Sequence, residues 1–149
     1  MPQYWFATQP VSGTVSVNAL PAGTNAIGDV GHQYRGSSTG AASGLHLVSG
    51  ASTNSTIVKA SNGRVLGWSL ANTNAAWRYV KLHNQTTNPT AGSGVVRVIA
   101  IPPNGISNFT LEGGIAFTTG IGLTTVTGSN DADTNAVAAG DIVGELLFS

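Results

Sequence analysis

Residues 95–126, VVRVIAIPPNGISNFTLEGGIAFTTGIGLTTV, decide the fold of this chain. Short runs rich in Val, Ile, Phe and Thr alternate there with Gly, Asn and Pro, which is typical of β-strands separated by tight turns. Pro102 and Pro103, followed by Asn104-Gly105, end one run, because proline cannot donate a hydrogen bond to a sheet and Asn-Gly favours a reversal. No segment of the chain combines a helical period with capping residues. The sequence therefore predicts an all-β fold.

The same pattern extends from this stretch and predicts nine strands. They are expected at 44–49, 55–60, 64–71, 76–84, 95–101, 106–111, 114–118, 120–127 and 141–148. Asn62-Gly63 between two of them predicts a β-hairpin, since both residues tolerate the positive φ of a type I′ turn. Gly113-Gly114 is expected to separate two others. Strands of this number, joined by loops of mixed length around one core, predict a jelly-roll-like antiparallel β-sandwich over residues 44–149.

Residues 1–43 differ from the rest and are predicted to form an extended N-terminal segment. They contain the aromatic cluster Tyr4, Trp5 and Phe6 and the alternating run VSGTVSVNAL at 11–20. Two interpretations stay open: a segment packed on its own domain, or an arm that crosses to another subunit. An extended chain spans up to about 3.3 Å per residue, and three adjacent aromatic side chains would anchor such an arm. Tyr4, Trp5 and Phe6 are therefore the candidate partner-binding residues.

The 149-residue chain is electrically neutral and poor in charge. Six Lys and Arg balance six Asp and Glu, and charged residues make up 8% of the chain, against about 25% in a typical protein. We therefore expect neither a nucleic-acid partner nor an anionic membrane surface as a partner. Without a signal-peptide pattern or a run of about 18 apolar residues, the protein is expected to be neither conventionally secreted nor membrane-spanning. Weak charge repulsion suits a protein that is packed against neighbours.

The sequence offers little for catalysis, and we expect no enzymatic activity, no bound metal and no cofactor. The chain has no cysteine, which excludes a thiolate zinc site and a cysteine nucleophile. His32, His46 and His83 have no metal-ligand spacing, and no GxSxG motif is present. Each histidine is expected to be structural.

A glycosidase would need two carboxylates across a cleft rich in aromatic side chains. The six carboxylates of the chain are Asp29, Glu112, Asp131, Asp133, Asp141 and Glu145. Aromatic residues make up only 7% of the chain, and we expect Trp68, Trp77 and Tyr79 to be core residues. A glycosidase cleft is therefore not expected.

The acidic loop at 128–135 is comparable to a calcium loop. Asp131, Asp133 and Asn135 have the opening spacing of an EF-hand. Ala136 then replaces the required glycine, and Ile142 stands where the bidentate glutamate belongs. We expect an exposed turn whose backbone is capped by Asn and Asp side chains, with an ion or a glycan at this loop left as open alternatives.

Four elements in the second half of the chain carry a resemblance. They are WRYVKLHN (77–84), the proline-rich break before ISNFTLEGGIAFTTGIGL (106–123), the loop TGSNDADTNAV (127–137) and the closing strand DIVGELLF (141–148). With these elements, residues 76–149 resemble small structural proteins of tailed bacteriophages. The resemblance implies a jelly-roll module of the capsid cement, or decoration, type, or a part of a tail or fibre head.

The function expected from this resemblance is that of a non-enzymatic virion protein. A cement protein would bind the major capsid protein on the capsid exterior as a homotrimer, after synthesis in the host cytoplasm. The alternative is a tail, fibre or baseplate head that recognises a host surface glycan. That role would require an exposed site, for which the 128–135 loop and any surface Trp are the candidates.

Overall fold

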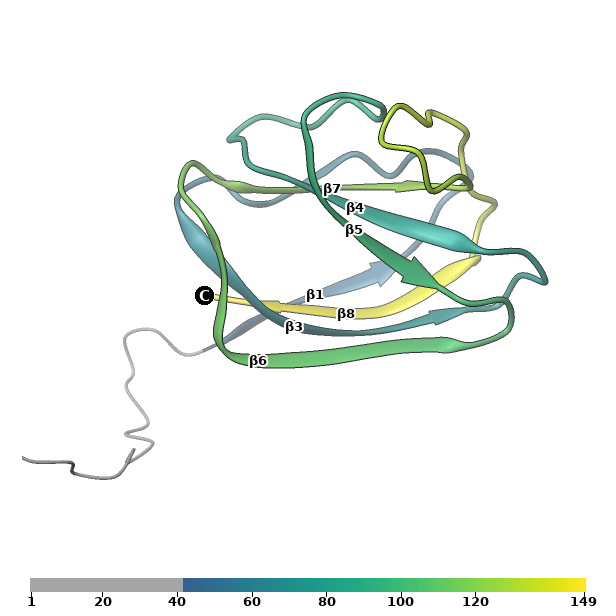
Figure 1. Ribbon diagram of the computed structural model, residues 1–149, viewed down its shortest axis with the longest axis horizontal. Coiled ribbons are helices and arrows are strands. Elements are labelled where there is room, and N and C mark those ends of the chain that lie inside the picture. The colour runs from purple at the N-terminus through teal and green to yellow at the C-terminus, as the bar shows by residue number, and fades with distance from the viewer. Residues whose placement is uncertain (1–41) are drawn as a thin grey trace, which may run out of the picture. The chain divides into compact units, whose positions relative to one another are not determined.

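The computed structural model describes residues 42–149, which form two antiparallel four-stranded sheets packed face to face (Figure 1). One sheet has the order β1-β8-β3-β6 and the other the order β2-β7-β4-β5. The strands are β1 (Ser43–Val48), β2 (Thr56–Lys59), β3 (Gly63–Asn72), β4 (Arg78–His83), β5 (Val95–Ile101), β6 (Ile106–Phe117), β7 (Ile121–Val126) and β8 (Ile142–Phe148). The described part of the chain contains no helix.

The strand pairing is that of a jelly roll. β1 pairs with β8, β2 with β7, β3 with β6 and β4 with β5, as if one long hairpin were rolled across two sheets. β8 also pairs with β3, and β7 with β4, which completes the two Greek keys of this architecture. The predicted antiparallel β-sandwich is therefore confirmed.

The hydrophobic core lies between the two sheets. Leu82 of β4 faces Leu123 of β7 across the ladder, and both are fully buried. From the other sheet, Leu70 of β3 and Leu146 of β8 join the same cluster. Each such side chain contributes about 1.5–3 kcal/mol when it is fully buried. These contacts hold the two sheets together.

Two strands that the sequence predicts at 106–111 and 114–118 are in fact one, β6. The Gly113-Gly114 pair does not end the strand. Gly114 has a φ of 66°, and the β3–β6 register shifts opposite it, between Val65 and Gly67. Four residues of β6, 111–114, lie there opposite one residue of β3, Leu66, and a bulge lets a strand continue past such extra residues. The prediction of nine strands was wrong by this one division.

The predicted hairpin at Asn62-Gly63 was also wrong. β2 and β3, which flank this turn, lie in different sheets, and neither residue has a positive φ. The turn connects the two sheets and does not close a two-stranded ladder. The turn at Pro102–Gly105 is confirmed by a hydrogen bond of 3.2 Å from the Gly105 amide to the Pro102 carbonyl, and it too joins strands of different sheets.

The aromatic side chains are only partly where the sequence predicted them. Trp68 packs against the core, as expected. Trp77 is 48% exposed, and Tyr79 is half-buried. Tyr79 neighbours the inward-facing Val80, so its own side chain points to the outer face of the sheet. The expectation that both residues belong to the core was wrong.

Candidate interaction surface

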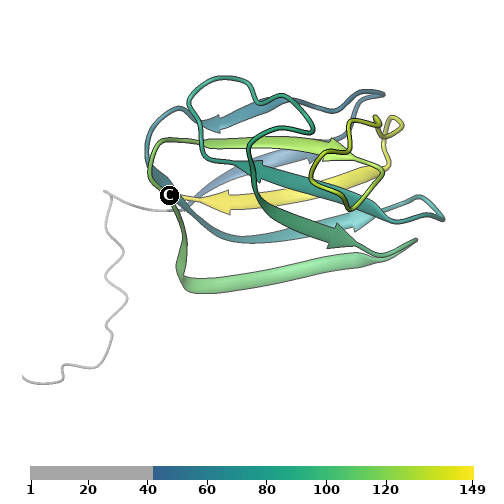
Figure 2. The same ribbon diagram turned by 45° about the horizontal axis from the view of Figure 1, so that its top comes forward.

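The edge strands β5 and β6 form one margin of the sandwich, which we call the β5–β6 margin. Each of them pairs with another strand on one side only, and β6 runs along the lower border in both Figure 1 and Figure 2. Five of the eight large hydrophobic side chains that are exposed in the described residues belong to it: Val96, Val98, Ile106, Phe109 and Leu111. Exposed apolar side chains on both edge strands make this margin a candidate interaction surface.

Phe109 shows why this margin is open. It lies directly opposite Trp68 in the ladder, and the two rings stack with centroids 4.8 Å apart. Trp68 also donates a hydrogen bond from Nε1 to the Ser107 hydroxyl at 3.1 Å. Phe109 therefore points to the inner face of its sheet, yet it is 41% exposed. The opposite sheet does not cover it, so the sandwich is open at this border.

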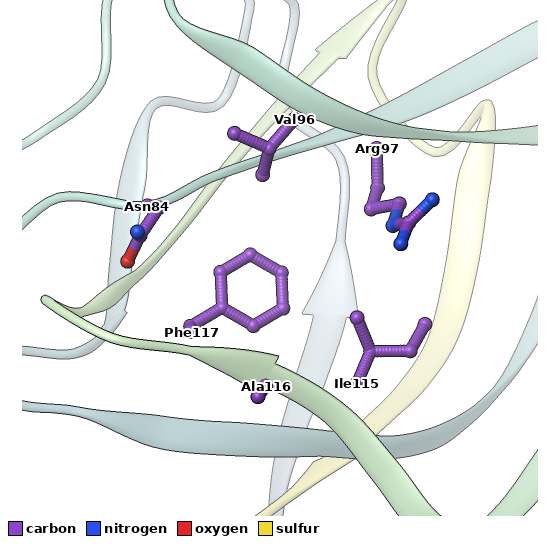
Figure 3. A pocket seen from close by; sticks show the side chains of 6 residues that line it. All are labelled: Asn84, Val96, Arg97, Ile115, Ala116 and Phe117. Carbon is purple, nitrogen blue, oxygen red and sulfur yellow. The ribbon is translucent and has the colours of Figure 1, made fainter.

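A shallow cleft lies between β5 and the end of β6 (Figure 3). It is lined by Asn84, Val96, Arg97, Ile115, Ala116 and Phe117. Its volume of about 190 Å³ is below the roughly 300–1,000 Å³ of typical small-molecule pockets. The cleft therefore suits contact with a segment of protein better than enclosure of a ligand.

Arg97 gives the margin a positive charge. It lies opposite the buried Leu82 in the ladder, which places it on the inner face of β5, although it is exposed. Within residues 42–149, the one salt bridge is between Arg78 and Asp141, so Arg97 is not paired with a carboxylate there. An incoming acidic or carbonyl group could accept hydrogen bonds from its guanidinium.

The outer face of the second sheet is covered by the connections between β4 and β5 and between β7 and β8 (Figure 1). Beneath them, Lys81 is fully buried and donates from Nζ to the Asn130 carbonyl. His83 is also fully buried, and its Nε2 lies 2.9 Å from the Thr124 hydroxyl. These two loops therefore cover Lys81 and His83 with polar contacts, and Asp131 of the second loop borders a shallow hollow beside Val96 and Val98 of β5.

The environment of His83 keeps its ring neutral. Burial lowers the pKa of this histidine, and the nearby Lys81 charge adds to the effect, while the backbone of Ser93 and Gly94 opposes it. Its buried Nδ1 has no hydrogen-bond partner among the described residues. The described neighbours of the ring are the Thr124 hydroxyl, the Lys81 charge and the backbone of Ser93 and Gly94.

Asp141 is the most strongly bound carboxylate of the sandwich. Its Oδ2 accepts a hydrogen bond of 2.5 Å from Arg78 Nε and one of 3.0 Å from the Ala138 amide, and its Oδ1 accepts one of 3.1 Å from Asn74. Burial raises the pKa of Asp141, but these hydrogen bonds and the Arg78 charge outweigh that and hold it below its ordinary value. The carboxylate joins β4 to β8.

The acidic loop is an exposed turn capped by its own side chains, as expected. Asp133 accepts a hydrogen bond of 2.7 Å from the Gly128 amide and another from the Asn135 side chain, and Asp131 is exposed. The described residues contain no group of three or more His, Cys, Asp or Glu side chains that could hold a metal ion.

The remaining candidates do not come together. His46 is exposed on β1, and Glu112 and Glu145 are exposed on β6 and β8. Asp29, His32 and the proposed arm residues Tyr4, Trp5 and Phe6 lie outside the described residues.

The β5–β6 margin was missed by sequence reasoning. Its signal is the run 106–111, where apolar residues fall at both odd and even positions, so that they cannot all face one core.

No model of a known protein family, no curated protein and no solved structure matches this chain. In residues 42–149 there is also no helix that is both long and apolar enough to cross a membrane.

Proposed function

We propose that this protein is a non-enzymatic virion protein of a tailed bacteriophage, a cement or decoration protein that binds the major capsid protein as a homotrimer and stabilises the shell. The observation that carries the proposal is the β5–β6 margin, where both edge strands of the described sandwich carry exposed apolar side chains. A surface of this kind serves contact with protein neighbours better than it serves chemistry.

Composition supports the same role. The neutral chain with only 8% charged residues has little charge repulsion to keep copies apart. Cyclic symmetry buries the same margin in every copy and leaves none exposed. The resemblance of residues 76–149 to phage structural proteins supplies the virion context. Placement on the capsid exterior, after synthesis in the host cytoplasm, belongs to this proposal.

The N-terminal segment has a part in the proposed assembly. Tyr4, Trp5 and Phe6 are the residues that would anchor it to a partner, because adjacent aromatic side chains give a large contact area. Removal of residues 1–12 should therefore weaken binding to the capsid without unfolding the sandwich, whose described strands begin at Ser43. Unchanged capsid binding after this deletion would contradict the role of the arm.

Two measurements test the proposed function. Light scattering of the purified protein should give about 45 kDa, three times the 15.0 kDa of one chain. Gold-labelled antibody against the protein should decorate the whole head of virions of a phage that encodes it. Label confined to the tail would refute the cement role and support the tail role. Virions without any label would refute both roles.

A tail or fibre head that binds a host glycan is the second candidate, and one observation favours it. Trp77 is 48% exposed, and its ring lies within 20° of parallel to that of Tyr79, with centroids 6.5 Å apart. Exposed aromatic faces of this kind combine apolar area with a polar edge. A glycan array should then show hits that Trp77→Ala abolishes; an array without hits removes this candidate.

A further inference from the structure

The geometry points to strand addition between copies: residues 11–20 of one copy pair with the free edge of β6 in a neighbouring copy. The inference rests on the proposed homotrimer and names the surface that joins its subunits. Main-chain hydrogen bonds to an exposed edge would give the affinity, and alternate side chains would set the register.

The receiving edge is residues 106–112 of β6. One side of this stretch pairs with β3, and no strand of the described sandwich pairs with the other side. The last regular pair before the bulge is Gly67–Thr110, so residues 106–110, about 17 Å of strand, pair regularly, and Leu111 and Glu112 lie at the start of the bulge. The stretch contains no Lys, Arg or Pro, the residues that most often protect a natural edge from pairing. Its only charge is Glu112.

The exposed side chains on the two faces of this edge define the sequence pattern of a strand that could pair with it. Phe109 lies on the inner face and is 41% exposed, and Leu111, at the start of the bulge, is 40% exposed. Asn108 and Thr110 are exposed on the outer face. Side chains opposite each other on adjacent strands are about 4.5–5.5 Å apart at Cβ and contact directly. A strand with apolar residues at every second position and small polar residues between them fits here.

Residues 11–20, VSGTVSVNAL, have this pattern. Val15, Val17 and Ala19 alternate with Ser16 and Asn18, so one face would cover Phe109 and Leu111 while the other stays polar. The run carries no charge that would have to be desolvated against the apolar inner face.

The length of residues 11–20 and the residues that flank them also fit pairing with this edge. Pro10 and Pro21 flank it directly, and proline ends strand pairing because it lacks an amide hydrogen. The run of ten residues between them is long enough for the seven-residue edge. Residues 21–42 follow it and can span up to about 70 Å, which reaches an adjacent subunit. Since each copy gives one run and receives one, the contacts are head-to-tail and close into a ring.

Cysteine cross-linking tests the pairing, because the natural chain has no cysteine and any disulfide must come from introduced residues. Thr110→Cys marks the outer face of the receiving edge, and Ser16→Cys marks the polar face of the run, with Thr14→Cys and Asn18→Cys as neighbouring registers. Full-length single variants are mixed, oxidised and run on a non-reducing gel. We expect a 30 kDa product, two chains of 15.0 kDa, from Thr110→Cys with one of the three.

A matched control and two other products decide the outcome. Val48→Cys, 56% exposed on β1 at the opposite edge of the same sheet, should give no comparable product with Ser16→Cys. Efficient dimers of Thr110→Cys alone would show that two β6 edges meet, and they overturn the inference. A double variant with Ser16→Cys and Thr110→Cys in one chain is the second comparison. If it forms a disulfide within single chains while the mixed single variants form none between chains, the inference is overturned as well. A 45 kDa particle that gives no cross-link refutes the strand addition and leaves the proposed function standing.

Discussion

His83 is the residue at which acid should act on this fold. Because burial lowers its pKa in the folded state below the ordinary value of 6.5, the unfolded chain binds this proton at a higher pH than the folded chain does. The contribution of the neutral ring to stability is complete above about pH 6.5 and is lost progressively as the pH falls from there towards the folded pKa.

We therefore expect a lower urea midpoint at pH 5.5 than at pH 7.5. His83→Gln should lower stability at both pH values, because it disturbs a buried contact with Thr124, and should flatten the difference between them. His46→Gln, at an exposed position on β1, is the control and should keep the full pH dependence. If the natural protein and both variants show the same difference in urea midpoint between pH 5.5 and pH 7.5, this role of His83 is refuted.

Asp141 provides the second prediction at this scale. Asp141→Asn should lower the free energy of unfolding by about 3 kcal/mol, since it leaves the Arg78 guanidinium buried without its counter-charge. Its low folded pKa means that the carboxylate stabilises the protein above about pH 3.8 and that this stability is lost as the pH falls further. Urea unfolding at pH 7 measures the first effect. Glu145→Gln, on the exposed side of β8, should stay within about 0.5 kcal/mol of the natural protein.

At the scale of the element, β6 depends on a bulge that one glycine allows. Gly114 has a φ of 66°, and a Cβ there would lie 2.9 Å from the Arg64 Cβ and from Leu66. Gly113 beside it has open space for a Cβ. The two glycines therefore form a natural pair for comparison.

Gly114→Ala should destabilise the protein by at least about 1–2 kcal/mol, the cost of a left-handed conformation for a residue with a Cβ. Gly113→Ala should be tolerated with a change of less than about 0.5 kcal/mol. Thermal unfolding of the two variants in parallel checks this. Similar losses in both would mean that the bulge does not lie at Gly114.

At the scale of the whole molecule, the exposed side chains of β6 should control assembly and not folding. Ile106→Lys combined with Leu111→Lys places charges on both faces of the free edge, where they oppose pairing. Since these residues are 61% and 40% exposed, we expect the trimer mass to fall about threefold by light scattering, with little change in thermal unfolding. Val48→Lys, 56% exposed at the opposite edge, should remain trimeric.

Retention of the trimer in the double lysine variant would exclude β6 as the joining surface. Loss of the trimer in Val48→Lys instead would show that the interface lies at the β1 edge.

The sequence by itself determined the class of fold, because the information for it is local. Alternating apolar residues and Gly, Asn and Pro turns specify strands wherever they occur, so β4, β5, β7 and β8 were predicted within a few residues. The capped acidic loop was predictable for the same reason, since Asp133 binds backbone and side chains only a few residues away.

Only the tertiary structure decided which strands meet. Asn62-Gly63 specifies a turn but not its partners, and Gly114 turns an apparent break into a bulge because β3 continues to pair beyond it. Trp77 is apolar enough for a core, yet it is exposed because it stacks on Tyr79 at the outer face of its sheet, and Leu111 is exposed on the edge strand β6. Burial depends on neighbours that are remote in sequence, so the β5–β6 margin could be recognised only once both sheets were in place.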